Sequence, residues 1–296
     1  MAVAAVLFGT SGVARGLGPD GADPVAVGAW RVVIGGLVLV VVAAFGRRPA
    51  APAGPATVPT ITRDRWWIAL GGIATVGYQL AFFAAVDRVG VGPAAVVTIG
   101  TGPIVAGLAE WVVSRRAPAA TRMVGVAVAL AGIVVLSGTG GGAPHVHGAA
   151  IAGWLFAVTA GCCYPVYGLA TQRLMTSRPP LTAVATVFGV GAALATPVAV
   201  VATVADTSTW GWRGVAMVAY LGVVATGLAY ALWALGLARL SLGDTVALTL
   251  AEPVAAVLLA AVVLDEPLGA VRVAGMLVVL IGVAVATASH PVPTSG

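Results

Sequence analysis

The fold of this chain is decided by a stretch that occurs twice, as RVGVGPAAVVTIGTGP at residues 88–103 and as RLSLGDTVALTLAEP at residues 239–253. The likeness continues to residue 136 in the first copy and to residue 286 in the second. The recurring residues are Arg88, Gly92, Thr98, Pro103, Arg122, Gly125 and Gly132, which return as Arg239, Gly243, Thr249, Pro253, Arg272, Gly275 and Gly282. Duplicated apolar segments, each broken by a proline at the same place, are typical of transporters built from two membrane-embedded halves.

The composition indicates an integral membrane protein. Hydrophobic residues make up 60% of the 296 residues, charged residues only 8%, and the mean hydropathy is +1.05. Soluble domains contain about 45–50% apolar and about 25% charged residues. Stretches such as Val32–Phe45 and Val254–Leu264 are continuously apolar, whereas the strands of membrane barrels alternate apolar and polar residues. We therefore expect a helical bundle surrounded by the lipid bilayer.

The excess of basic over acidic residues does not indicate a nucleic-acid partner. The net charge is +5 and all 15 basic residues are arginines, most of them in short loops between apolar spans. No basic segment precedes the apolar start, so no signal peptide is expected. Cys162 and Cys163 lie inside a span and are interpreted as small packing residues. His145 and His147 form either a weak metal pair or part of a glycine-rich outer loop, and we expect no metal and no cofactor.

Ten spans are expected. A helix needs roughly 20 apolar residues to cross the hydrocarbon core, and reading between charge clusters gives ten such segments. They are 2–18, 25–45, 66–86, 90–113, 121–138, 148–171, 181–204, 213–238, 244–264 and 271–289. The first is the shortest and is interrupted by Arg15, so its end is left open. The segment 46–65 carries prolines and charges and is expected to be a solvated cytoplasmic loop.

The arginines indicate the orientation. With the N-terminus in the cytoplasm, ten arginines fall in inner loops and four in outer loops, which favours two cytoplasmic termini under the positive-inside rule. Each half, residues 1–140 and 146–290, then holds five spans, so the second half enters the membrane with the opposite polarity. The expected fold is an all-α polytopic membrane protein with ten transmembrane helices arranged as two inverted five-helix repeats. A substrate site typically forms between such repeats, near the midplane.

Several ordered segments resemble the EamA-type transporters of the drug/metabolite transporter superfamily. They are Phe8-Gly9, AWRVVIGGL at 29–37, YQLAFFAAV at 78–86, TGPIVAGLAEW at 101–111, YALWALGLARL at 230–240 and LAEPVAAVLLAAVVLDEPL at 250–268. Phe8-Gly9 stands where the family usually has Trp-Gly, and Glu266 matches the family's loop acid. The resemblance implies a secondary transporter in the cytoplasmic membrane, often an exporter of amino acids, other metabolites or drugs.

Three charged residues stand within apolar spans, where each costs roughly 2.5–3.5 kcal/mol unless it faces the bundle interior or water. Glu252, next to Pro253, either handles substrate and a coupled proton or serves as a structural partner, most simply of Arg31. Arg31 either binds a substrate carboxylate or extends towards the outer interface. Glu110 lies near the inner end of its span and is expected to pair at the interface. The proline also frees the carbonyl of Thr249 for a ligand.

Aromatic and amide side chains inside the spans complete the expected site. A cavity lined by rings with a few hydroxyls and amides suits an amphipathic small molecule, although some of these rings are expected only to pack between helices. The expected substrate-binding residues are Arg31, Tyr78, Gln79, Trp154, Tyr164, Tyr230, Trp233, Thr249 and Glu252, with Tyr167 as a further ring inside a span. Pro103 and Pro253 are matched kinks and candidate hinges.

These features predict a secondary transporter that moves a small organic metabolite, such as an amino acid, amine or drug-like solute, by alternating access. Export is the expected direction and protons are a candidate coupling ion. A passive, channel-like facilitator is the alternative. A membrane-embedded enzyme is a weaker hypothesis, because no catalytic residues are found in the spans. The chain has no lysine and hence no phosphate-binding GxxxxGK[ST] loop.

Overall fold

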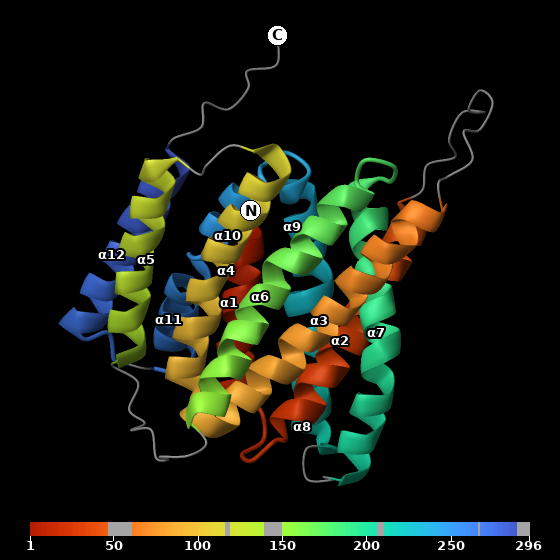
Figure 1. Cartoon of the computed structure of the whole chain (residues 1–296). Coiled ribbons are helices and arrows are strands. Elements are labelled where there is room, and N and C mark those ends of the chain that lie inside the picture. The colour runs from red at the N-terminus through yellow and green to blue at the C-terminus, as the bar shows by residue number, and fades with distance from the viewer. Residues whose placement is uncertain (47–60, 116–118, 139–149, 206–209, 266, 289–296) are drawn as a thin grey trace.

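A computed structural model describes residues 1–46, 61–115, 119–138, 150–205, 210–265 and 267–288 (Figure 1). Within these ranges the regular structure is entirely helical, which confirms the all-α expectation for that part of the chain. The helices are α1 (Ala2–Gly16), α2 (Pro24–Phe45), α3 (Ile61–Val89), α4 (Val91–Ser114), α5 (Ala120–Gly138), α6 (Ala150–Leu174), α7 (Pro180–Ala205), α8 (Trp212–Gly222), the π-helical η2 (Val223–Leu228), α9 (Ala229–Leu237), α10 (Leu242–Thr249), α11 (Glu252–Val263) and α12 (Ala270–Thr287).

Eight helical segments of the described chain are long and apolar enough to cross a membrane. Two of the eight combine shorter helices: Trp212–Leu237 joins α8, η2 and α9, and Leu242–Val263 joins α10 and α11. Two further apolar helices, Ala2–Gly16 and Ala120–Leu136, are shorter. Together they occupy the ten places expected from the sequence.

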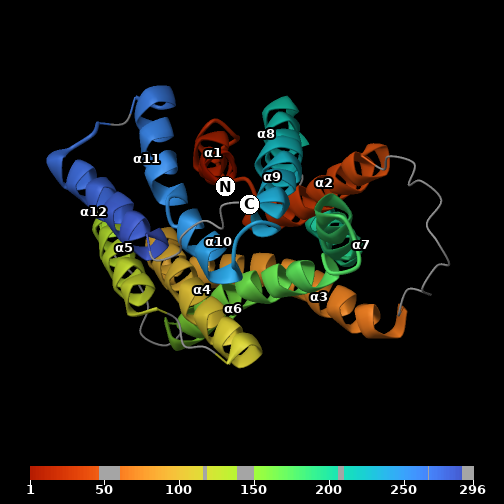
Figure 2. The same ribbon diagram turned by 90° about the horizontal axis from the view of Figure 1, so that it is seen from above.

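The helices stand side by side with their axes roughly along one direction (Figure 1). Viewed along that direction in Figure 2, α5 and α12 form a pair at one side, and α2 and α7 lie towards the other. α6 packs along α3, and α1 stands between α11 and α8 (Figure 2). α1 begins and α12 ends at the same end of the bundle, which also holds the start of α3 (Figure 1).

Local sequence signals account for several helix ends. Asp23 begins α2 by accepting hydrogen bonds from the backbone N–H groups of Val25 and Ala26, at 3.1 and 3.0 Å, and Pro24 occupies the first helical position. Gly90 separates α3 from α4 with φ at 85°, a conformation that only glycine adopts without steric cost. α3 and α4 can therefore reverse direction across a single residue.

The α5–α12 pair depends on glycines. A Cβ added at Gly125 would overlap the backbone of Ala286, and one added at Gly132 would come within 2.7 Å of the backbone nitrogen of Val279. Residue numbers rise along α5 as they fall along the contacting face of α12, so the two helices are antiparallel. Without side chains at these positions the backbones approach closely, as is common between membrane helices.

Two expectations need revision at the residue level. Residues 61–65, expected in a solvated loop, form the first turns of α3, because α3 begins at Ile61. The matched prolines also differ in effect: α4 continues through Pro103, whereas the helix ends at Thr249 and restarts at Glu252, beside Pro253. His145 and His147, most of the 46–65 segment and Glu266 lie outside the described residues.

Candidate functional site

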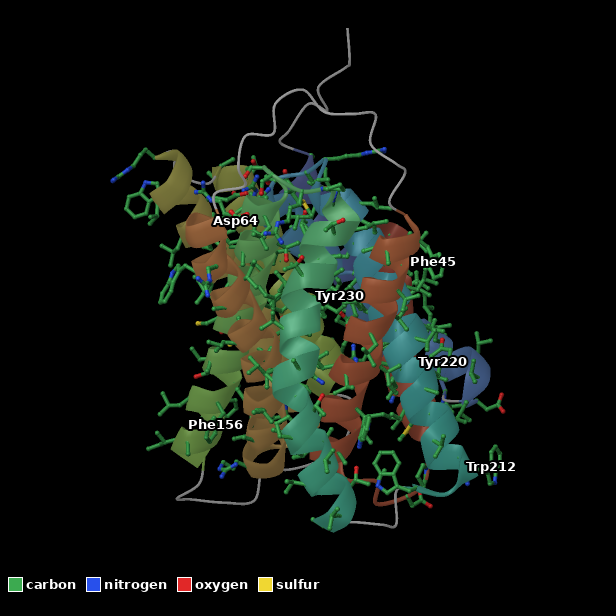
Figure 3. The ribbon with its side chains drawn as sticks, turned by 90° about the vertical axis from the view of Figure 1, so that its right-hand side faces the viewer. Phe45, Asp64, Phe156, Trp212, Tyr220 and Tyr230 are labelled. Atoms are coloured by element: carbon green, nitrogen blue, oxygen red, sulfur yellow. The ribbon has the colours of Figure 1, made fainter. Side chains whose placement is uncertain are left out.

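A cavity of about 390 Å³ lies in the middle of the bundle, between helices of both halves of the chain. Its position is marked by Tyr230, which Figure 3 shows between Asp64 at one end of the bundle and Trp212 at the other, nearer to the end with Asp64. The volume falls within the range of about 300–1,000 Å³ that is usual for small-molecule sites. The lining extends to Gly12 and Arg15, both exposed near the end of α1, so the cavity opens towards the end of the bundle where α1 finishes.

Most of the side chains expected from the sequence meet in this cavity. Those that line it are Arg31, Tyr78, Gln79, Tyr164, Tyr230, Thr249 and Glu252, together with the candidate hinge Pro253. Two expected residues do not line it. Trp154 is 39% exposed on the outer surface of α6, and Trp233 is fully buried behind the tyrosines. The other candidate hinge, Pro103, is buried within α4 and is also not part of the lining.

Arg31 faces into the bundle. Its Nε donates a hydrogen bond of 2.8 Å to Oγ1 of Thr226, which lies in the π-helical turn η2. A π-turn inserts an extra residue into a helix and is frequent at functional sites. Here it places a threonine hydroxyl opposite α2. With Nε fixed, the two terminal nitrogens of Arg31 remain in the cavity wall, where a guanidinium can bind a carboxylate or a phosphate.

Glu252 begins α11 at the break after α10, and its side chain lines the same cavity as Arg31. It forms no ion pair with any residue that the structure describes. The expectation that Arg31 serves as its ion-pair partner is therefore not met in this conformation. A carboxylate that faces a cavity without an ion-pair partner is available to a ligand or a proton.

The remaining wall is aromatic. The hydroxyls of Tyr167 and Tyr230 are 2.6 Å apart, and the hydroxyl of Tyr164 lies 2.7 Å from Oγ1 of Thr249. Phe8 packs edge-on against Tyr230, with ring centroids 4.8 Å apart. These rings form a rigid apolar surface with a few hydroxyl groups, an arrangement that suits a ring-bearing or amphipathic solute.

Gln79 has a positioning contact rather than a free amide. Its Nε2 donates to the carbonyl oxygen of Gly28 at 3.1 Å, which ties α3 to α2. The amide nitrogen of Gln79 is thus bonded to the backbone of α2, and its amide oxygen can accept a hydrogen bond from a molecule in the cavity. Gln79 thus both holds α3 against α2 and lines the cavity.

Several lining residues were not expected from the sequence, among them Phe8, Ser11, Thr75 and Thr226. The Oγ of Ser11 is buried without a hydrogen-bond partner among the described residues. Serines and threonines are common in membrane helices, where they bond to their own backbone, so residue type alone does not mark them. Phe8 belongs to the Phe8-Gly9 pair, one of the segments that resemble the EamA-type transporters.

The end of the bundle opposite the opening is closed by packed side chains. Trp233, Leu237, Leu242 and Leu174 are all nearly or fully buried and belong to one hydrophobic cluster. Trp233 lies directly behind Tyr164 and Tyr230, with ring centroids 6.4 and 5.7 Å away. This layer separates the cavity from the end where α1 begins.

A buried ionic cluster joins three helices at that closed end. Arg122 of α5 pairs with Glu110 of α4 through one terminal nitrogen and with Asp244 of α10 through the other, at 2.9 Å. The side chain of Arg122 is 7% exposed. Ser241 donates to Asp244 at 2.8 Å, and the backbone N–H of Gly243 donates to Glu110 at 2.8 Å. Glu110 thus contacts both halves of the chain, through Arg122 of α5 in the first half and through the backbone N–H of Gly243 in the second.

No cluster of three or more histidine, cysteine, aspartate or glutamate side chains able to hold a metal ion is found within the described ranges. The cavity itself contains a single carboxylate among its lining residues, Glu252. Its chemistry is that of a binding site, with the guanidinium groups of Arg15 and Arg31, the carboxylate of Glu252, hydroxyls and aromatic rings.

Comparison with known proteins agrees with this arrangement. The sequence pattern of the EamA-like transporter family matches the chain twice, at residues 1–138 and 151–288. The chain is 31% identical over 290 residues to a Bacillus subtilis (strain 168) protein described as an uncharacterized transporter, YwfM, with 97% of this chain and 92% of that protein covered. A crystal structure of a protein with 24% identity superposes with a TM-score of 0.77 over 97% of this chain and 94% of the other, which bears on the fold alone. This chain is therefore an integral membrane protein and belongs to the EamA-like transporter family.

Proposed function

We propose that this protein is a secondary transporter that exports a small organic solute by alternating access through the central cavity. The observation that carries the proposal is that Arg31 and Glu252 line one cavity between both halves of the chain, and that this cavity is open at one end and closed at the other. A carrier needs a site between two gates, and the inverted repeat expected from the sequence supplies two equivalent halves to form them.

The lining favours a solute that is amphipathic and carries charge. Arg31 offers a guanidinium for a carboxylate, Glu252 offers a carboxylate for an amino group, and Tyr78, Tyr164 and Tyr230 offer rings. Amino acids and aromatic amines have this combination of groups. A sugar or a purely apolar molecule would leave the two charges unmatched, at a cost in binding free energy.

We further propose that protons drive transport through Glu252. A carboxylate that binds an amino group in one conformation and a proton in the other exchanges the two ligands across the membrane. The transporter then needs no ATP. We place both termini in the cytoplasm, from the distribution of arginines, so that the open end of the cavity faces outwards and the protein works in the cytoplasmic membrane.

Counterflow in proteoliposomes tests the transport mechanism. Purified protein is reconstituted, and a panel of amino acids, amines and nucleosides is tested for exchange against labelled solute, with and without a pH gradient. A carrier shows accelerated uptake when unlabelled substrate is present on the opposite side. Equal fluxes with and without substrate on that side would indicate a passive facilitator instead. A panel in which only uncharged solutes exchange would contradict the proposed substrate class while leaving the carrier mechanism intact.

A further inference from the structure

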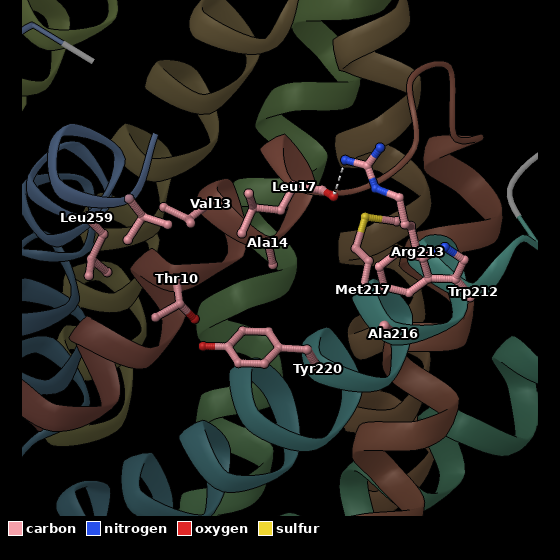
Figure 4. Close-up of a pocket in the computed structure, with 11 residues that line it drawn as sticks. Thr10, Val13, Ala14, Leu17, Trp212, Arg213, Ala216, Met217, Tyr220 and Leu259 are labelled. Carbon is pink, nitrogen blue, oxygen red and sulfur yellow. Dashed lines mark hydrogen bonds between the residues drawn. The ribbon is translucent and has the colours of Figure 1, made fainter. Parts of the chain in front are cut away.

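A second and larger hollow lies on the outer surface of the bundle, away from the central cavity. Its volume is about 600 Å³, and it is formed by α1, α8 and α11. The lining is apolar for most of its length, with Val13, Ala14 and Leu17 on α1 and Ala216 and Met217 on α8 (Figure 4). We refer to it as the α1–α8 groove. α1 separates it from the central cavity, because Thr10 and Val13 face the groove whereas Ser11 and Gly12 face the cavity.

The α1–α8 groove lies on a face that is apolar around its rim. Val215 on α8, Val223 on η2 and Val262 on α11 are 51%, 43% and 79% exposed. In a chain that spans a membrane, such side chains face lipid tails. The groove is therefore open to the bilayer rather than to water, and its occupants are drawn from molecules dissolved in the membrane.

The charged group of the groove lies at one end. Arg213 is the single charged residue among the described residues that line it, and it stands in the first turn of α8 beside Trp212. Trp212 is 80% exposed, as is common for tryptophans at a membrane–water interface. The guanidinium of Arg213 donates one hydrogen bond, of 3.0 Å, to the carbonyl oxygen of Leu17 (Figure 4). It forms no ion pair with a carboxylate of the described chain.

The length of the groove matches an extended chain with a charged head. Tyr220 lines its far end, seven residues after Arg213 along α8, which corresponds to about 10 Å along the helix axis. The phenolic oxygen of Tyr220 points towards Thr10 on α1 (Figure 4). A cation at interfacial depth above a narrow apolar slot is complementary to a phosphate with a hydrocarbon chain below it.

The equivalent place in the other half of the fold is filled by protein. In the expected inverted repeat, α6 and α3 correspond to α1 and α8. α6 and α3 pack tightly, since a Cβ at Gly71 would lie 2.9 Å from Ala170 and one at Gly77 would lie 3.2 Å from Cys163. In contrast, α1 and α8 leave a hollow of about 600 Å³ between them. The groove is thus a gap between helices that close packing has not filled.

We propose that the α1–α8 groove binds one anionic phospholipid, with its headgroup phosphate at Arg213 and one acyl chain between α1 and α8. The acyl chain fills the space between α1 and α8, whereas the corresponding helices of the other half, α6 and α3, pack directly against each other. It also holds α1 apart from α8. The site is separate from the central cavity, and its occupancy can be measured without a transport assay.

Native mass spectrometry of the full-length protein tests this site. After stepwise delipidation, the protein is titrated with phosphatidylglycerol or with phosphatidylcholine carrying the same acyl chains. We expect one lipid per chain with about fivefold preference for phosphatidylglycerol, because one arginine near the headgroup contributes roughly that factor. Arg213→Gln should reduce the preference to near unity, and Ala216→Phe should prevent binding of either lipid by filling the slot.

Matched controls separate the groove from general lipid contact. Val215→Phe adds the same ring to the neighbouring residue of α8, outside the lining, and should leave binding unchanged. Arg239→Gln removes an exposed arginine after α9, at the opposite end of the bundle, and should leave the headgroup preference unchanged. Equal retention of the two lipids by the unmodified protein, or equal losses in Ala216→Phe and Val215→Phe, would overturn the proposal.

Discussion

Arg122 and Asp244 are far apart in sequence, yet their side chains form a buried ion pair with the Arg122 nitrogen 2.9 Å from the carboxylate oxygen of Asp244. The pair joins α5, in the first half of the chain, to α10, in the second. Glu110 completes the cluster from α4. Because the cluster lies at the end of the bundle opposite the opening of the cavity, it ties the two halves together where the cavity is closed.

Arg122→Met should destabilise the protein by about 3–5 kcal/mol, because it removes the guanidinium that neutralises two largely buried carboxylates. Thermal and denaturant unfolding in detergent measure the change. Adding Glu110→Gln and Asp244→Asn to this variant should recover part of the loss. The more exposed pair Arg178–Asp64 is the control: Asp64→Asn should change stability by no more than about 1 kcal/mol. Similar losses for Arg122→Met and Asp64→Asn would argue against a special role for the cluster.

Glu252→Gln should abolish the dependence of transport on a pH gradient while leaving the exchange of substrate for substrate measurable, because glutamine keeps the shape of the side chain but cannot carry the proton. Uptake into proteoliposomes with and without an imposed gradient measures this. Glu252→Asp should retain gradient-driven transport at a lower rate. A Glu252→Gln protein that still responds fully to the gradient would remove Glu252 from the coupling mechanism.

Thr226→Val should raise the KM for substrate about fivefold with little change in protein stability, because loss of one positioning hydrogen bond of about 1 kcal/mol releases Arg31 from its orientation. Thr203→Val is the matched control, since Thr203 accepts a hydrogen bond from Trp30 between helices but does not line the cavity. Concentration dependence of exchange gives the KM. An equal KM in both variants would show that Thr226 does not position Arg31 for binding.

Trp233→Ala should cost about 3–5 kcal/mol of stability, because it removes a fully buried ring from the layer that closes the cavity. Trp154→Ala should stay within about 0.5 kcal/mol, since Trp154 is 39% exposed on the outer surface of α6. Unfolding in detergent compares the two. Substrate exchange by Trp154→Ala should match that of the unmodified protein, and a selective loss of binding in that variant would return Trp154 to the site.

The sequence predicted the helical bundle and much of the cavity because the bilayer imposes a simple rule. A charged or amide group inside an apolar span must face protein or water, so Gln79 and Glu252 were expected inside the bundle, and Arg31 either there or extended towards the outer interface. The structure brings all three to one cavity. The same rule does not apply to tryptophan, which is stable in a core or against lipid. Trp154 and Trp233 were therefore both predicted to bind substrate. Which of the two is exposed depends on the helices that pack against each of them, and the sequence does not show this.

Thr226 and the ionic cluster were missed for a different reason. The role of Thr226 depends on the π-turn at Val223–Leu228, and no local pattern in that apolar stretch marks such a turn. No partner was predicted for Arg122, and Asp244 lies in the other half of the chain. A single sequence contains no information about which charged side chains meet when helices from both halves pack together.

Alternate exposure of one residue in the cavity tests the central claim most directly. In a protein with Cys162 and Cys163 replaced by serine, Ala95→Cys places a single thiol in the cavity wall. A membrane-impermeant thiol reagent should label it from the outer side in the unmodified background, and the transported substrate should slow that labelling. In combination with Arg122→Met, labelling should become possible from the cytoplasmic side as outer labelling falls. Simultaneous labelling from both sides, insensitive to substrate, would contradict alternating access and indicate a continuous pore.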